Sequence, residues 1–148
     1  MNWMSVENLR KQNLDKAISG YKRAMKVFKK KETPMEYSKT IFLMGNAYLT
    51  LAGVRVKEKN TESAIKAYKE ALEVYSKEAF PVDYSMTQNN LGNAYGTLAE
   101  VRDKEANIQS AIKAYKEALT IITKNSYPEL HKLITHNLDN AQKQLTIK

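Results

Sequence analysis

Two histidines, His131 and His136, are the residues of this chain best suited to metal binding or proton transfer. On a helix, however, residues five apart point about 140° away from each other, so the two rings do not converge on one ion. The 148 residues contain no cysteine, and no catalytic or phosphate-binding motif occurs. The sequence therefore predicts a protein that is not an enzyme and that holds no metal and no cofactor.

The net charge of +8 is concentrated near the start of the chain. Residues 1–33 hold nine Lys and Arg against three Asp and Glu. A basic helix can attract an acidic partner, but lysine stems also suit an ordinary solvated face. This uneven distribution argues against a uniform stripe for nucleic acid. No apolar run is long enough to span a membrane, and no apolar leader follows the first methionine, so we expect a cytoplasmic protein.

A repeat of 47 residues runs through the chain. The string "AIKAYKEAL" stands at residues 64–72 and again at 111–119. Between residues 34–80 and 81–127, 27 of 47 positions are identical without a gap. A fixed period of this size is typical of helical-repeat arrays. We therefore predict a single array over residues 1–148, made of a half repeat at 13–33, full repeats at 34–80 and 81–127, and a terminal capping helix at 128–148.

Each full repeat has the pattern of two antiparallel helices, which makes the expected fold all-α. In the first full repeat we expect helices at 35–58, with Thr33 as N-cap, and at 62–78, capped by Asn60 or Thr61. The matching helices of the second repeat are expected at 82–105 and 109–125, with connections of two to four residues. Near the chain ends we expect a short segment at 2–11 and helices at 14–31 and 129–146.

These helices resemble those of the tetratricopeptide repeat family. The resemblance rests on Met44-Gly45 and Tyr48 in the first helix of a repeat, and on Ala64, Tyr68 and Ala71 in the second. The next repeat supplies Leu91-Gly92, Tyr95, Ala111, Tyr115 and Ala118. The period of 47 exceeds the family's common period of about 34 residues. The resemblance implies a right-handed superhelical array of antiparallel helix hairpins, here with longer helices and a longer link.

The small and aromatic residues of this motif have a structural explanation. Glycine inside a helix costs about 0.5–1 kcal/mol relative to alanine. Gly45 and Gly92 are acceptable if another helix passes so close that a side chain would clash. We therefore expect Tyr48, Tyr68 and their counterparts to fill the core rather than to do chemistry.

The resemblance also implies a concave groove lined by the first helix of each repeat. Asn46, Asn93 and Asn140 recur there at the repeat period, and amides could hold the backbone of an extended peptide. The alternative is that these asparagines are only polar surface residues. Phe42, Leu43 and Leu49 suggest an apolar anchor. The predicted groove comprises Lys39, Phe42, Leu43, Asn46, Leu49, Thr50, Met86, Asn89, Asn90, Asn93, Thr97, His136, Asn137 and Asn140, with Leu133 and Lys143 beside them.

Members of the family that bind chaperone tails hold a terminal carboxylate with Lys, Asn and Arg side chains. Asn46 and Asn90 match two of those positions. Phe42, Leu133 and Asn137 stand where lysine or arginine is needed. The resemblance therefore argues against an acidic C-terminal peptide as the ligand.

The sequence predicts a scaffold that binds a protein, as a peptide or a partner helix, in its groove. One alternative is self-assembly through open ends, mainly the N-terminal end, where Trp3, Met4, Val6 and Leu9 have few obvious partners unless this segment folds back. At the other end, Asp139 and Gln142 replace the Gly and Tyr of the motif and suggest a solvated cap. A further alternative is electrostatic binding by the basic residues Lys22, Arg23, Lys26, Lys29, Lys30 and Lys31.

Overall fold

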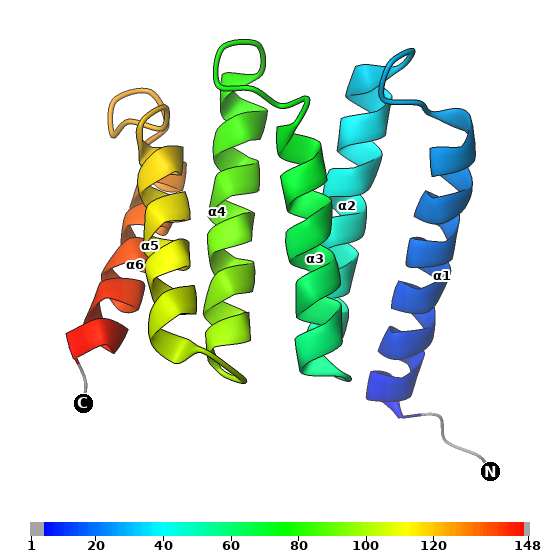
Figure 1. Cartoon of the computed structure of the whole chain (residues 1–148), viewed down its shortest axis with the longest axis horizontal. Helices are drawn as coiled ribbons and strands as arrows, with labels where there is room; N and C mark the ends of the chain where they lie inside the picture. The colour runs from blue at the N-terminus through cyan, green and yellow to red at the C-terminus, as the bar shows by residue number, and fades with distance from the viewer. Residues whose placement is uncertain (1–4, 147–148) are drawn as a thin grey trace. The chain divides into compact units, whose positions relative to one another are not determined.

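The computed structural model describes residues 5–146, and every regular element in this range is an α-helix (Figure 1). The predicted all-α class is therefore confirmed. The helices are α1 Val6–Val27, α2 Pro34–Ala52, α3 Lys57–Leu72, α4 Pro81–Ala99, α5 Lys104–Leu119 and α6 Pro128–Thr146. Within the described residues, no helix combines the length and apolar character needed to cross a bilayer.

The chain divides into two compact units, a first unit that ends at Val74 and a second unit that begins at Tyr75. In the first unit, α2 packs against both α1 and α3. Ile18 of α1 forms a buried cluster with Ala47 and Leu51 of α2. Ala64 and Ala71 of α3 are fully buried. Their small side chains allow the backbones of α2 and α3 to approach closely. The assignment of repeats to one array, with its boundaries, stays a prediction.

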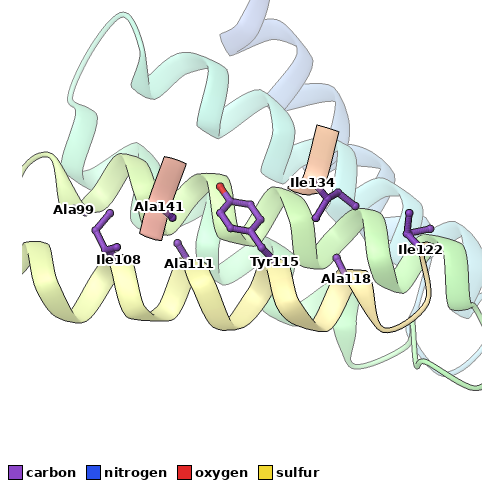
Figure 2. Close-up of a cluster of buried hydrophobic side chains, with 8 residues drawn as sticks. All are labelled: Ala99, Ile108, Ala111, Tyr115, Ala118, Ile122, Ile134 and Ala141. Carbon is purple, nitrogen blue, oxygen red and sulfur yellow. The ribbon is translucent and has the colours of Figure 1, made fainter. Parts of the chain in front are cut away.

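In the second unit, α5 packs against α4 and α6, and α6 also touches α4. A cluster of buried side chains joins the three helices, with Ile108 and Tyr115 from α5 and Ile134 from α6 (Figure 2). Ile122, in the link after α5, closes one end of the cluster. The second unit therefore holds α4, α5 and α6 around one core.

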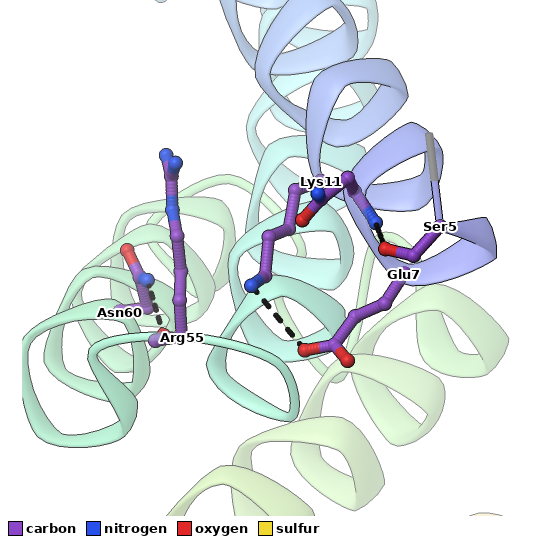
Figure 3. Close-up of polar contacts among 6 residues, drawn as sticks. Ser5, Glu7, Lys11, Arg55 and Asn60 are labelled. Carbon is purple, nitrogen blue, oxygen red and sulfur yellow. Dashed lines mark hydrogen bonds and ion pairs between the residues drawn. The ribbon is translucent and has the colours of Figure 1, made fainter. Parts of the chain in front are cut away.

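The first helix differs from the prediction of two segments at 2–11 and 14–31. It runs unbroken from Val6 to Val27. Ser5 begins it, because the Ser5 side-chain oxygen accepts a hydrogen bond from the Asn8 backbone N–H at 3.1 Å (Figure 3). Asn13 does not break the helix, since an exposed asparagine costs a helix interior under about 1 kcal/mol. Trp3 and Met4, which the alternatives invoked, lie outside the described residues.

Thr33 stands before α2 as predicted, but its side chain makes no capping hydrogen bond. Its hydroxyl oxygen instead accepts from the Lys29 backbone N–H at 2.9 Å. The same hydroxyl donates back to the Lys29 carbonyl oxygen at 3.2 Å. The threonine therefore stabilises the turn that follows α1, and Pro34 begins α2 with its fixed backbone angle.

The turn inside each hairpin lies earlier than predicted. Helix α2 ends at Ala52 instead of residue 58, and α3 begins at Lys57 instead of residue 62. Asn60 therefore lies inside α3, where its side-chain N–H donates to the Arg55 carbonyl oxygen at 2.9 Å (Figure 3). Thr61 is also inside α3, and its hydroxyl donates to the Lys57 carbonyl oxygen at 2.6 Å. These side chains bond backwards to the chain before them and do not cap the helix.

The second repeat has the same geometry. Helix α4 ends at Ala99 and α5 begins at Lys104, where residues 105 and 109 were predicted. Asn107 donates to the Arg102 carbonyl oxygen at 2.9 Å, as Asn60 does to Arg55. The links at 73–80 and 120–127, which separate hairpin from following helix, are longer than the predicted two to four residues.

Both hairpin turns end on a residue in the left-handed backbone conformation, Val56 with φ 40° and Asp103 with φ 43°. Aspartate tolerates this conformation, but a β-branched side chain there clashes with its own backbone, at a cost of about 1–2 kcal/mol. The Val56 side chain is 61% exposed and loses little packing when replaced. We expect Val56→Asn to raise the free energy of unfolding by about 1 kcal/mol, measured by denaturant titration.

The matched control for this change is Asp103→Asn. Because both side chains suit the left-handed region, this control should leave stability within about 0.5 kcal/mol of the parent. Equal stability of Val56→Asn and the parent protein would mean that the turn carries no such strain.

Candidate functional site

Polar side chains of α4 and α6 meet on one face of the second unit. The side-chain N–H of Asn137 donates to Asn89 Oδ1 at 3.1 Å and so links α6 to α4. Asn89 is itself buried, and its Nδ2 lies 3.4 Å from Asn90 Oδ1. One turn further along α4, the Thr97 hydroxyl donates to the Asn93 carbonyl oxygen at 3.0 Å. Asn89, Asn90 and Asn137, three of the predicted groove residues of the second unit, therefore lie near one another.

Two exposed apolar side chains stand one helical turn before Asn90 and Asn137 on the same helices. Met86 of α4 is 40% exposed and Leu133 of α6 is 50% exposed. They are 47 residues apart and occupy the same position of the repeat. Both residues were predicted in or beside the groove, but their pairing was not, although the spacing of 47 residues was the available signal. We call the surface formed by Met86, Asn90, Asn93, Leu133, Asn137 and Asn140 the α4–α6 face.

An open hollow of about 700 Å³ runs along α6, and its lining includes Leu133 and both histidines. His136 is exposed, and its Nε2 lies 3.1 Å from Asn140 Nδ2. Across residues 5–146, no group of three or more His, Asp and Glu side chains is placed to hold a metal ion. The arrangement is suited to hydrogen bonding and apolar contact.

The predicted groove residues of the first unit lie along α2. Lys39 is exposed, while Leu43 and Leu49 are half-buried. The ring of Phe42 packs against Tyr68 with centroids 6.0 Å apart. Phe42, Leu43 and Leu49 therefore contribute partly to packing, and their role as an apolar anchor stays a prediction. Thr50 donates to the Asn46 carbonyl oxygen at 2.9 Å, as Thr97 does to Asn93.

Each full repeat contains one close contact between a glycine and a tyrosine. A Cβ atom on Gly92 would lie 2.5 Å from Tyr115 Cε1, and one on Gly45 would lie 2.7 Å from Tyr68 Cε1. The bare glycine therefore leaves room for the ring, as the sequence predicted. Both tyrosine side chains are buried.

The same tyrosines bind the asparagines that follow the glycines. The Tyr115 hydroxyl donates to Asn93 Oδ1 at 2.6 Å, and the Tyr68 hydroxyl donates to Asn46 Oδ1 at 2.5 Å. These asparagines were expected to offer a partner both donor and acceptor, and this internal bond was not predicted. The constant separation of 22 residues between Asn and Tyr was the signal that could have found it.

Helix α6 presents charged side chains where α4 presents small buried ones. Lys132 and Asp139 are exposed, whereas Ser85 and Gly92, at the corresponding positions of α4, are buried. A further helix that packed on α6 as α5 packs on α4 would have to bury both charges. Burying unpaired charge is costly, so this end of the chain is poorly suited to stacking.

The basic residues near the start of the chain are partly neutralised. Lys30 forms an ion pair with Glu73, and this hydrogen bond raises the pKa of Lys30 above its ordinary value. Asp15, one of the few acidic residues of this segment, pairs instead with Arg55 of the turn after α2 at 2.6 Å. The other predicted basic residues, Lys22, Arg23, Lys26, Lys29 and Lys31, are exposed.

Comparison with known proteins adds a family match. A family model described as tetratricopeptide repeat matches residues 45–78 and 88–125. The two matched segments cover most of the α2–α3 and α4–α5 hairpins. No curated protein and no solved structure matches the chain.

The contact between Gly92 and Tyr115 should make Gly92→Ala destabilising. The added methyl group forces the buried ring to move, which costs about 1–3 kcal/mol and outweighs the better helix propensity of alanine. Gly96→Ala is the matched control, because a Cβ on Gly96 meets nothing within 4 Å. This control should raise the free energy of unfolding by about 0.5–1 kcal/mol. A thermal unfolding series that showed both alanines stabilising would contradict the close contact.

Alkaline pH should destabilise the second unit through Tyr115. Burial raises the pKa of Tyr115 to about 12 in the folded protein. In the unfolded chain the pKa of a tyrosine is about 10. The unfolded state therefore loses this proton first, and the free energy of unfolding should fall by about 2–3 kcal/mol as pH rises across that interval. Denaturant titrations at several pH values measure this loss, and Tyr115→Phe should reduce it. A loss that is equally large in the Tyr115→Phe variant would assign it to other groups.

Proposed function

Because the chain belongs to the tetratricopeptide repeat family, we propose that it is a scaffold that binds other proteins and that it carries out no catalysis. Repeats of this family generally mediate protein–protein interactions. We propose further that the partner binds along the α4–α6 face of the second unit. The corresponding face of α2, with Lys39, Asn46 and Thr50, is proposed as a second contact surface in the first unit.

The observation that supports this proposal is the combination of amides and apolar side chains on one face. Asn93 and Asn137 carry side-chain amides, whose N–H and C=O groups match those of a polypeptide backbone. Met86 and Leu133 are exposed beside them and can contact an apolar side chain of the partner. A central apolar contact surrounded by polar groups is the usual composition of a protein-binding surface.

The two alternatives have less support. Self-assembly through α6 would bury Lys132 and Asp139, and association through Val6 and Leu9 at the N-terminal end stays an untested alternative. Electrostatic binding would use a basic cluster in which Lys30 is already paired with Glu73. Neither alternative uses the recurring asparagines.

The test uses short random peptides displayed on phage and selected on the unmodified protein. Met86→Glu combined with Leu133→Glu should weaken binding of the selected peptides at least about tenfold, because a carboxylate replaces the apolar contact at both positions. Both side chains are already exposed, so the fold should survive the changes. Affinities are measured by isothermal titration calorimetry.

Val101→Glu is the matched control, since Val101 is 42% exposed in the turn after α4 and lies outside the α4–α6 face. It adds one negative charge to the second unit and should leave peptide affinity within about twofold. Peptides that bind the Met86/Leu133 double variant as tightly as the parent would place their site elsewhere and contradict the proposal.

A further inference from the structure

The orientation of the Asn93 side chain is fixed by the atom that meets Tyr115. The Tyr115 hydroxyl oxygen lies 2.6 Å from Asn93 Oδ1. This length is usual for an O–H···O bond and short for an N–H···O bond, whose common length is about 2.9 Å. The hydroxyl therefore meets the amide oxygen and not the amide nitrogen. Because the amide group is planar, Asn93 Nδ2 is turned away from the tyrosine.

Tyr115 is held firmly enough to impose this orientation. Its ring is buried among α4, α5 and α6, with the hydroxyl directed away from the α5 backbone (Figure 2). Gly92 lies directly against the ring, so the ring has its place only because position 92 has no side chain. The same burial raises the pKa of Tyr115 to about 12, so at neutral pH the hydroxyl keeps its proton and donates it.

The arrangement occurs in both full repeats. Gly45, Asn46 and Tyr68 repeat the contacts of Gly92, Asn93 and Tyr115, with a hydroxyl-to-amide distance of 2.5 Å. Because the same contact recurs, the orientation of the asparagine amide follows from the spacing of 22 residues between Asn and Tyr in each repeat.

Helix α6 offers a contrast, since Asp139 replaces the glycine of the motif. The Asn140 side-chain nitrogen there lies near His136 and both residues are exposed. The amide of Asn140 is therefore oriented by a different partner. Of the three recurring asparagines, Asn46 and Asn93 have the side-chain oxygen held by a tyrosine, whereas the Asn140 amide nitrogen lies against a histidine.

We propose that Tyr115 is a positioning residue that turns the two N–H groups of the Asn93 side chain toward the partner, so that this point binds a backbone carbonyl oxygen. The inference rests on the proposed function of the α4–α6 face. It also selects the form of the partner. Carbonyl groups inside a helix are already bonded within that helix, so the segment that binds Asn93 is an extended peptide and not a partner helix.

The orientation can be tested without any partner. Tyr115→Phe removes the hydroxyl and keeps the ring, so the Asn93 side-chain amide is released while the core stays filled. The nuclear magnetic resonance signals of the Asn93 Nδ2 group should shift and broaden in this variant. Tyr127→Phe, at an exposed tyrosine of the second unit, is the control and should leave them in place. Unchanged Asn93 signals in Tyr115→Phe would overturn the positioning role.

The choice of acceptor is tested with the phage-selected peptides. Tyr115→Phe should weaken their binding about three- to tenfold, the effect of one hydrogen bond. Replacing the peptide carbonyl that faces Asn93 by a thioamide, a poor acceptor, should weaken binding to the parent protein. The same replacement should have little further effect in Tyr115→Phe, because the two changes remove one interaction. N-methylation of the peptide nitrogens identifies any need for a peptide N–H, and such a need at Asn93 would overturn the inference.

The outcomes separate the two proposals. If the peptides bind the Met86/Leu133 double variant as tightly as the parent, their site lies elsewhere and the proposed function fails. Peptides that require Met86 and Leu133 but bind Tyr115→Phe as tightly as the parent leave the site in place and overturn only the positioning role.

Discussion

The close contact between a glycine of one helix and a tyrosine of the next is the interaction on which each full repeat depends. At Gly92 and Gly45 the absence of a side chain lets an aromatic ring lie directly against the helix backbone. The ring fills the core and brings a hydroxyl group to the neighbouring asparagine. One contact therefore sets the helix spacing, fills the interior and orients a polar group at the surface.

This arrangement explains why scaffold and candidate site cannot be separated cleanly in the sequence. The nine-residue string at 64–72 and 111–119 is repeated because its alanines and tyrosines build the core. Yet Tyr68 and Tyr115 within that string also bind the asparagines of the preceding helix. Among the paired helices, the first helices differ more, at eight positions against three in the second helices, and Lys39 of α2 corresponds to Met86 of α4.

The repeat period was enough to predict the number, type and pairing of the full-repeat helices, because apolar spacing and the recurring prolines mark them directly. The position of the hairpin turn was not predictable in the same way. Asn60 and Thr61 suit a helix cap, but their side chains can equally bond backwards to a carbonyl, and tertiary packing decides between the two. The actual turn ends on Val56, a residue type that normally avoids the left-handed region.

The candidate site shows a similar limit. Recurrence identified Asn46, Asn93 and Asn140, since polar residues at a fixed repeat position are visible in one sequence. The orientation of an amide depends on a neighbour 22 residues away, and so it required coordinates. The burial of Asn89 was also not predictable from the sequence. It depends on how α4 packs against α6, where the Asn137 side chain donates a hydrogen bond to Asn89.

The pairing of helices that are neighbours along the chain has a kinetic consequence. Contacts within the α2–α3 and α4–α5 hairpins close over short stretches of sequence, and chains rich in such local contacts fold quickly. Each hairpin can form soon after its second helix leaves the ribosome. The α4–α6 face is different, because it needs a helix from beyond the hairpin. During synthesis the hairpin of the second unit can therefore form first, and the α4–α6 face is completed only when α6 arrives.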